Sequence, residues 1–222
     1  MIYLSADWHL TKEDISNIES LKTLKMDDIV IVLGDLTNDW SKIENNFWFV
    51  DYIERYNVQF LFIDGNHEDF KKINELPIQY WNGIKVHQLG RNVFHILRGQ
   101  AFLLEGKRFW VMGGGFSGLS YIERHKDIWQ EEEKPSYLEY EQGLEALKKY
   151  NGKIDYILTH TPPLRVIKEY TLSDEWSEIN SFMDEVATKV NFKKWYFGHF
   201  HDNRVLDNQY EIIYKKMRQL ND

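Results

Sequence analysis

Seven side chains that can bind a metal ion occur in five short segments of the sequence. The segments are Asp7-Trp8-His9, Gly34-Asp35, Gly65-Asn66-His67-Glu68, His160 and Gly198-His199-Phe200-His201. Their donor atoms are imidazole nitrogens and carboxylate or amide oxygens, and the chain has no Cys that could add sulfur. Such a set suits manganese, iron or zinc and is too rich in nitrogen for a dedicated magnesium or calcium site.

The number of donors predicts two ions in place of one. Seven ligands would crowd a single ion, whereas the two oxygens of Asp35 can bridge a pair. Paired ions about 3.5–4 Å apart stabilise both the attacking and the leaving oxygen of an in-line displacement at phosphorus. The chemistry indicated is therefore phosphoester hydrolysis with two divalent ions, manganese being favoured and iron or zinc being the alternatives.

Each of the five segments comes at or just beyond the end of a run of strand-forming residues. The runs are residues 2–5, 29–33, 60–63, 154–159 and 194–197. In an open α/β sheet, sites assemble at the carboxyl ends of the strands, so we expect the donors to converge there. Asp7 and His9 are two residues apart, and if their segment is extended both side chains leave one face. The same expectation holds for His199 and His201.

The rest of the chain predicts an α/β fold in one domain, residues 1–222. The first third alternates strands with helices at residues 11–25 and from Ser41 to about Asn57. The middle third holds short strand candidates at 85–86, 93–97, 101–104 and 108–112, typical of an antiparallel meander, so the sheet is mixed or there are two sheets. Helices at 136–150 and 177–190 and a hairpin over 204–214 follow.

Two segments between these elements carry no motif. Gly113-Gly114-Gly115 predicts a sharp turn that needs positive φ. Residues 116–135 are interpreted as a surface excursion or lid, with Glu131–Glu133 as a solvated face. Substrate specificity is expected in the loops 113–135 and 162–176, and His87 and His95 are interpreted as structural.

Composition limits the classes of partner. The chain has a net charge of −8 and lacks the excess of basic residues that a general duplex-binding protein needs. Bound cations would offset some of this charge locally, so an anionic substrate remains compatible with the composition. No signal peptide or membrane span is predicted, and the absence of Cys suits a reducing compartment, so the cytoplasm is expected. The sequence indicates no oligomeric state.

The five segments, taken together and in this order, resemble the calcineurin-like metallophosphoesterase superfamily. The resemblance extends from Asp7 to His201, and the forms His160-Thr-Pro-Pro and Tyr196-Phe-Gly-His-Phe-His-Asp-Asn are similar to its small single-domain bacterial and phage members. It implies a four-layer αββα sandwich with mixed sheets. It also implies hydrolysis of a phosphodiester or phosphomonoester through in-line attack by a metal-bridging hydroxide.

The resemblance also implies a role for each residue. The implied ligands are Asp7, His9 and His201 for the first ion, Asn66, His160 and His199 for the second, and Asp35 as the bridge. His67 would be catalytic, donating to the phosphate or to the leaving oxygen. Asn38 stands where protein Ser/Thr phosphatases have a second acid and where purple acid phosphatases have a Tyr, so bacterial phosphodiesterase-like members are favoured.

The substrate is left open by the sequence. A small phosphoester or nucleotide-like substrate is expected, with Arg124, Asn203 and Arg204 as candidate contacts. Asn203 and Arg204 have a second interpretation, in which they orient His201. A nuclease or nucleic-acid end-processing enzyme is one alternative, and a non-catalytic scaffold of the same fold is another.

Overall fold

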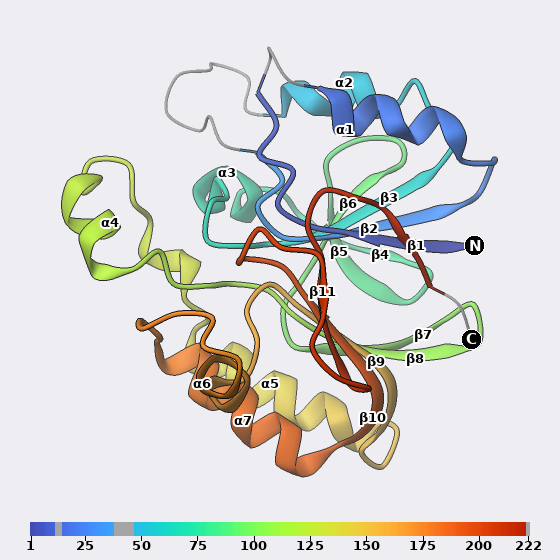
Figure 1. Ribbon diagram of the computed structural model, residues 1–222. Coiled ribbons are helices and arrows are strands. Elements are labelled where there is room, and N and C mark those ends of the chain that lie inside the picture. The colour runs from blue at the N-terminus through green and yellow to red at the C-terminus, as the bar shows by residue number, and fades with distance from the viewer. Residues whose placement is uncertain (12–14, 38–46, 221–222) are drawn as a thin grey trace.

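A computed structural model describes residues 1–11, 15–37 and 47–220 of the chain. Two β-sheets face each other and helices cover both outer faces, as Figure 1 shows. The α/β class and the four-layer αββα sandwich expected from the sequence are therefore confirmed. The predicted start of a helix at Ser41 and the expectations for Asn38 fall outside the described residues.

The first sheet has seven strands in the order β13-β1-β2-β3-β6-β5-β4. Their bounds are Ile2–Ser5 (β1), Ile29–Leu33 (β2), Gln59–Ile63 (β3), Ile78–Trp81 (β4), Ile84–Gln88 (β5), Val93–Ile96 (β6) and Arg218–Gln219 (β13). Strands β1, β2, β3 and β6 run parallel, while β13 pairs antiparallel with β1, and β5 and β4 continue antiparallel beyond β6. The sequence analysis missed β4 and β13.

The second sheet has six strands in the order β11-β12-β10-β9-β8-β7. Their bounds are Gln100–Leu104 (β7), Lys107–Met112 (β8), Lys153–Thr159 (β9), Asn191–Phe197 (β10), Arg204–Val205 (β11) and Tyr210–Ile212 (β12). The four inner strands are parallel, and β7 and β11 pair antiparallel at the edges. The predicted meander is thus divided, because the chain passes from the first sheet to the second between β6 and β7.

Helices cover the outer face of each sheet, and the helix at residues 119–124 projects to one side of both (Figure 1). Their bounds are Ser16–Glu19 (α1), Trp48–Ile53 (α2), Phe70–Asn74 (α3), Leu119–Arg124 (α4), Tyr137–Lys148 (α5), Leu164–Glu169 (α6) and Glu178–Lys189 (α7), with short 3-10 turns at Ser20–Thr23 (η1) and Glu131–Glu133 (η2). A capping box begins α5: Ser136 Oγ accepts from Glu139 N, and the Glu139 carboxylate accepts from Ser136 N. No helix among the described residues is long and apolar enough to cross a membrane.

Strand β2 shows why the inner strands are apolar along their whole length. Ile31 faces the other sheet and packs in the central core, while Val30 and Val32 face the helix layer of α1 and α2. Both faces of the strand are buried, so alternation of polar and apolar residues disappears, as parallel strands require. The polar residues Asp35 and Asn66 come after the last residues of β2 and β3, at the carboxyl edge of the sheet.

Candidate metal centre

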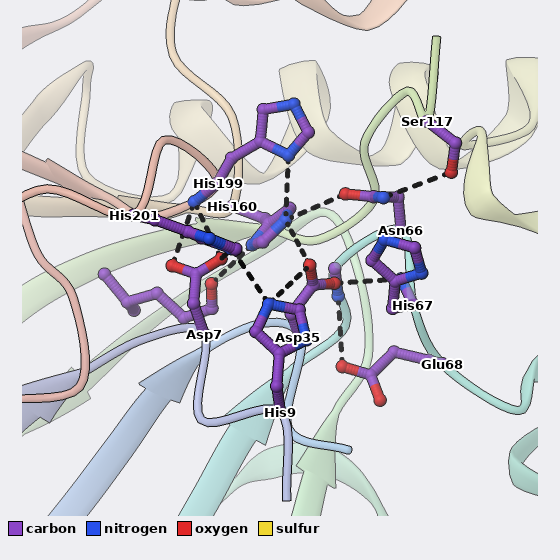
Figure 2. A network of polar contacts seen from close by, with 12 residues as sticks. Asp7, His9, Asp35, Asn66, His67, Glu68, Ser117, His160, His199 and His201 are labelled. Carbon is purple, nitrogen blue, oxygen red and sulfur yellow. Dashed lines mark hydrogen bonds and ion pairs between the residues drawn. The ribbon is translucent and has the colours of Figure 1, made fainter. Parts of the chain in front are cut away.

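The seven predicted donors come together at the carboxyl ends of the parallel strands, where the two sheets meet (Figure 2). Asp7 and His9 follow β1, Asp35 follows β2, Asn66 follows β3, His160 follows β9, and His199 and His201 follow β10. Contributions from both sheets explain how residues 192 positions apart, such as His9 and His201, come into contact.

Four of the donors form one compact group. Atoms of Asp7, His9, Asp35 and His201 all lie within 4.8 Å of one another. The Nε2 atoms of His9 and His201 are 2.9 Å apart, and His9 Nε2 is 3.7 Å from Asp35 Oδ2. His201 Nε2 lies 3.6 Å from Asp7 Oδ1. This group contains the three residues implied for the first ion together with the implied bridge.

The other three donors are Asn66, His160 and His199, and they meet around His160 Nε2. That nitrogen lies 3.0 Å from Asn66 Oδ1, 3.3 Å from His199 Nδ1 and 3.5 Å from Asp35 Oδ2. His160 Nδ1 is 2.7 Å from the carbonyl oxygen of Leu33, which can only accept, so Nδ1 carries a proton. A carbonyl partner of this kind fixes the ring and leaves Nε2 as a metal donor. Asp35 is the one residue common to both groups.

Most of the donors have a backbone conformation that the sequence analysis did not anticipate. Positive φ is found at Asp7 (52°), His9 (46°), Asp35 (52°), His199 (70°) and His201 (50°). The expectation of extended segments with alternating side chains was therefore wrong, although the side chains do converge. A non-glycine residue at positive φ costs of order 1–3 kcal/mol, and such residues concentrate at functional sites, where the surrounding structure holds them.

Two glycines let the donor segments approach one another. A Cβ atom on Gly65 would lie 2.1 Å from Asp35 Oδ1, and one on Gly198 would lie 2.4 Å from Asp7 Oδ2. Any side chain at either position would displace a donor oxygen. In the triple-glycine segment Gly114 has φ of +91°, so the predicted positive φ is present there, and a Cβ on Gly115 would lie 3.0 Å from Asn66 Oδ1.

Two buried carboxylates dominate the electrostatics of the site. Asp7 and Asp35 are 0% and 2% exposed. Among the described residues their ion-pair partners are histidines, with no Lys or Arg within salt-bridge distance. Burial raises the pKa of Asp7 to about 8 and lowers the pKa of His9 to about 4 and of His199 to about 3. Two buried carboxylates beside nitrogen donors that shed their protons are a good fit for divalent ions.

His67 lies beside the donors and makes contacts of another kind. Its backbone N–H donates to Asp35 Oδ1 at 2.8 Å, and its side chain lines the pocket in front of the donors. Its Nδ1 lies 3.4 Å from the hydroxyl of Tyr121, and the two rings meet edge to face with centroids 5.1 Å apart. Burial and the charge of Asp35 raise the pKa of Tyr121, so the phenol keeps its proton at neutral pH.

The segment interpreted as a surface excursion also supports the donors. Ser117 accepts a hydrogen bond from Asn66 Nδ2 at 3.1 Å, and its own hydroxyl donates to Glu133 Oε2 at 2.5 Å. Glu133 is 0% exposed, so the expectation of a solvated face was wrong for this residue. The sequence analysis missed Ser117, Tyr121 and Glu133, because a run of three Glu and a Ser 51 positions from Asn66 give no local signal.

The three candidate substrate contacts lie outside the residues that line this pocket. Arg124 Nε donates to the carbonyl of Ser120 on its own helix, and Arg204 pairs with Asp202 at 3.3 Å. Asn203 exchanges two hydrogen bonds with the backbone of Tyr214, whose ring stacks on His201 with centroids 4.9 Å apart. This geometry places Asn203 behind His201.

Comparison with known proteins gives one family match. The sequence profile of the calcineurin-like phosphoesterases matches residues 1–203, a range that includes all of the predicted donors. Among solved structures, a protein of unknown function from Aquifex aeolicus is similar, with 17% identity over 77% of this chain and 86% of that chain and a TM-score of 0.37. A search of curated proteins found no match.

Proposed function

The chain belongs to the calcineurin-like phosphoesterase family, and from that premise we propose that it is a metal-dependent enzyme that hydrolyses a phosphodiester or phosphomonoester. The observation that carries the proposal is the convergence of nitrogen and oxygen donors around two buried carboxylates that have no Lys or Arg partner among the described residues. A cavity of this kind is costly unless a cation enters it. Manganese is the ion we expect, with iron or zinc as alternatives.

The donors divide into two sets that share Asp35. Those that would hold the first ion are Asp7, His9 and His201, and those that would hold the second are Asn66, His160 and His199. When bound, a pair of divalent ions supplies a nucleophile at neutral pH and stabilises the attacking and leaving oxygens at phosphorus. Leu33 and Ser117 orient the second set through His160 and Asn66.

His67 would act on the substrate from the pocket side. When the Tyr121 hydroxyl donates a hydrogen bond to His67 Nδ1, the neutral imidazole carries its own proton on Nε2. That N–H can donate to a phosphoryl oxygen or to the leaving oxygen as negative charge develops there. Tyr121 is then a positioning residue, which sets the tautomer and the ring orientation of His67.

The two alternatives are less well supported. Processing of extended nucleic acid calls for cationic side chains along a groove, and within residues 1–11, 15–37 and 47–220 no Lys or Arg lines the pocket in front of the donors. A scaffold has no need to keep seven donors in contact or to maintain positive φ at most of them.

The proposal is tested by metal content and turnover. The protein purified with manganese should contain two ions per chain and hydrolyse aryl phosphodiesters or monoesters. Absence of both metal and turnover with manganese, iron and zinc would refute the enzyme assignment. A His67→Ala variant that keeps its metal should lose activity by roughly 10²-fold or more, the usual contribution of a positioned proton donor. Full activity in that variant on every substrate would remove His67 from the mechanism.

A further inference from the structure

The pocket in front of the donors has an outer part that the proposed chemistry does not use. Its inner wall is formed by donor residues and His67, and its outer wall by residues 116–118 and the segment 173–176 together with Phe200. Three aromatic side chains line the outer part, namely Phe116, Trp176 and Phe200. Among the described residues that line the pocket there is no Lys or Arg, and the outer carboxylate comes from Glu175.

The aromatic side chains are held in place while part of their surface stays open. Trp176 is 45% exposed, and the ammonium of Lys168, which does not line the pocket, lies 4.9 Å from its ring centroid. Phe200 meets Phe197 edge to face at 6.2 Å, which fixes it beside the adjacent donor segment. Aromatic surface left open in a pocket is stabilised by a flat ring, and stacking of a base on such a side chain strengthens binding roughly tenfold to a hundredfold.

Glu175 gives this outer wall its polarity. Its backbone N–H donates to Ser173 Oγ at 3.0 Å, which fixes the segment. A Cβ on Gly118 would lie 2.3 Å from Glu175 Oε2, so the carboxylate rests against bare backbone. No ion pair among the described residues involves Glu175. An ionised carboxylate only accepts hydrogen bonds, so it repels a second phosphate and favours a neutral group with N–H donors.

On the basis of the proposed phosphoesterase function, we infer that the substrate is a nucleotide diester with a single phosphate and a base that presents N–H donors. The base lies against Trp176 and Phe200, and Glu175 accepts from its edge. Guanine satisfies this best among the common bases, because its adjacent ring N–H and amino group match the two oxygens of one carboxylate. Substrates with several phosphates are disfavoured by the same carboxylate.

The inference is tested with two diesters that share one leaving group. They are the p-nitrophenyl ester of guanosine 5′-monophosphate and its abasic analogue, in which a methoxy group replaces guanine. The contacts of p-nitrophenol are common to both and cancel in the ratio of kcat/KM. We expect a ratio of at least roughly 10 in favour of the guanosine ester. Trp176→Ala and Glu175→Gln should each reduce this ratio severalfold.

A matched control is Tyr137→Ala, which removes an aromatic side chain that is 75% exposed and does not line the pocket. Its ratio should equal that of the unaltered protein. Binding gives a readout without turnover: saturation-transfer NMR of guanosine with zinc-loaded protein should show contacts to the base protons that Trp176→Ala abolishes. Equal hydrolysis of both esters, or a ratio unaffected by Trp176→Ala, would overturn the inference. Hydrolysis of neither ester would instead count against the proposed function.

Discussion

Asp35 comes after β2 and Asp64 after β3, two neighbouring strands of the first sheet. The two carboxylates differ in the side chains that pair with them. Both are almost completely excluded from solvent, at 2% and 1% exposure. Asp64 pairs with a cation of the chain itself, since Arg98 Nε donates to it at 2.7 Å and His95 Nε2 lies 3.0 Å away. Asp35, and Asp7 beside it, face only histidines and backbone N–H groups among the described residues.

The pKa of both Asp35 and Asp64 is held well below its usual range, by the charge of His160 at Asp35 and by that of Arg98 at Asp64, whereas the pKa of Asp7 moves the other way. Burial alone would raise the pKa of Asp64, but the charge of Arg98 and the contact with His95 hold it well below its usual range. Burial of Asp7 is not offset in this way, and its pKa rises to about 8. At Asp64, where the carboxylate is structural, Arg98 of the same chain supplies the opposite charge. At the metal centre the charge beside Asp35 is that of a histidine, His160, whose proton a divalent ion can replace.

The largest effect is expected from removing the shared carboxylate. Asp35→Asn should lose both ions and reduce turnover by at least roughly 10³-fold, because stabilisation of the displacement by the metals amounts to several kcal/mol. Metal analysis and kinetics on the same preparation would measure this. Retention of two ions per chain would contradict the assignment of Asp35 as the bridge.

The opposite result is expected in the Asp64 group. Arg98→Met leaves a buried carboxylate without its cation and should reduce the free energy of unfolding by about 3–5 kcal/mol. Urea denaturation would measure the loss, and metal analysis of the folded fraction should still find two ions. A variant with unchanged stability but lost metal would show that the two groups act as one.

The pH dependence should also separate the two groups. Without metal, His9 and His199 are neutral in the fold but protonated when unfolded below about pH 6.5, so their contribution to stability falls as pH drops from 6.5 toward 4. Asp7 holds a proton up to about pH 8. Burial lowers the pKa of His160, but the charge of Asp35 outweighs burial and raises that pKa to about 10. The contribution of Asp7 therefore falls as pH rises from about 4 to 8, and that of His160 falls as pH rises from about 6.5 to 10.

Metal binding removes those protons, so manganese should raise the melting temperature more at pH 8 than at pH 6.5. The comparison uses chelator-treated and manganese-loaded protein at each pH. The Arg98–Asp64 pair adds nothing to the difference, because Asp64 is ionised throughout this range. A gain from manganese that shrinks between pH 6.5 and pH 8 would contradict the assigned protonation states.

The smallest effect is expected at the edge of the metal centre. Tyr121→Phe keeps the ring contact with His67 and removes a hydrogen bond worth about 1 kcal/mol, or roughly fivefold in kcat. The loss should be greater for phenyl than for p-nitrophenyl esters, since a poorer leaving group depends more on protonation by His67. An equal loss with both esters would assign Tyr121 a purely structural role.

The sequence by itself determined the donors and their place in the fold. Asp7, Asp35 and His160 could be recognised because each follows an apolar run, and parallel strands bring their carboxyl ends to one edge. The capping box at Ser136 and the positive φ at Gly114 each depend on residues only a few positions apart, so local sequence patterns are enough to predict them.

Only the tertiary structure decided how the donors are aimed and what supports them. Asp7 and His201 have positive φ just beyond the ends of their strands, where the two sheets meet, and no local sequence pattern predicts this conformation. The contact of Tyr121 with His67 joins residues 54 positions apart and depends on where α4 lies. Asp35 and Asp64 also differ in the side chain that pairs with each carboxylate, His160 for Asp35 and Arg98 for Asp64. These partners are distant in sequence, so only tertiary packing decides the pairing.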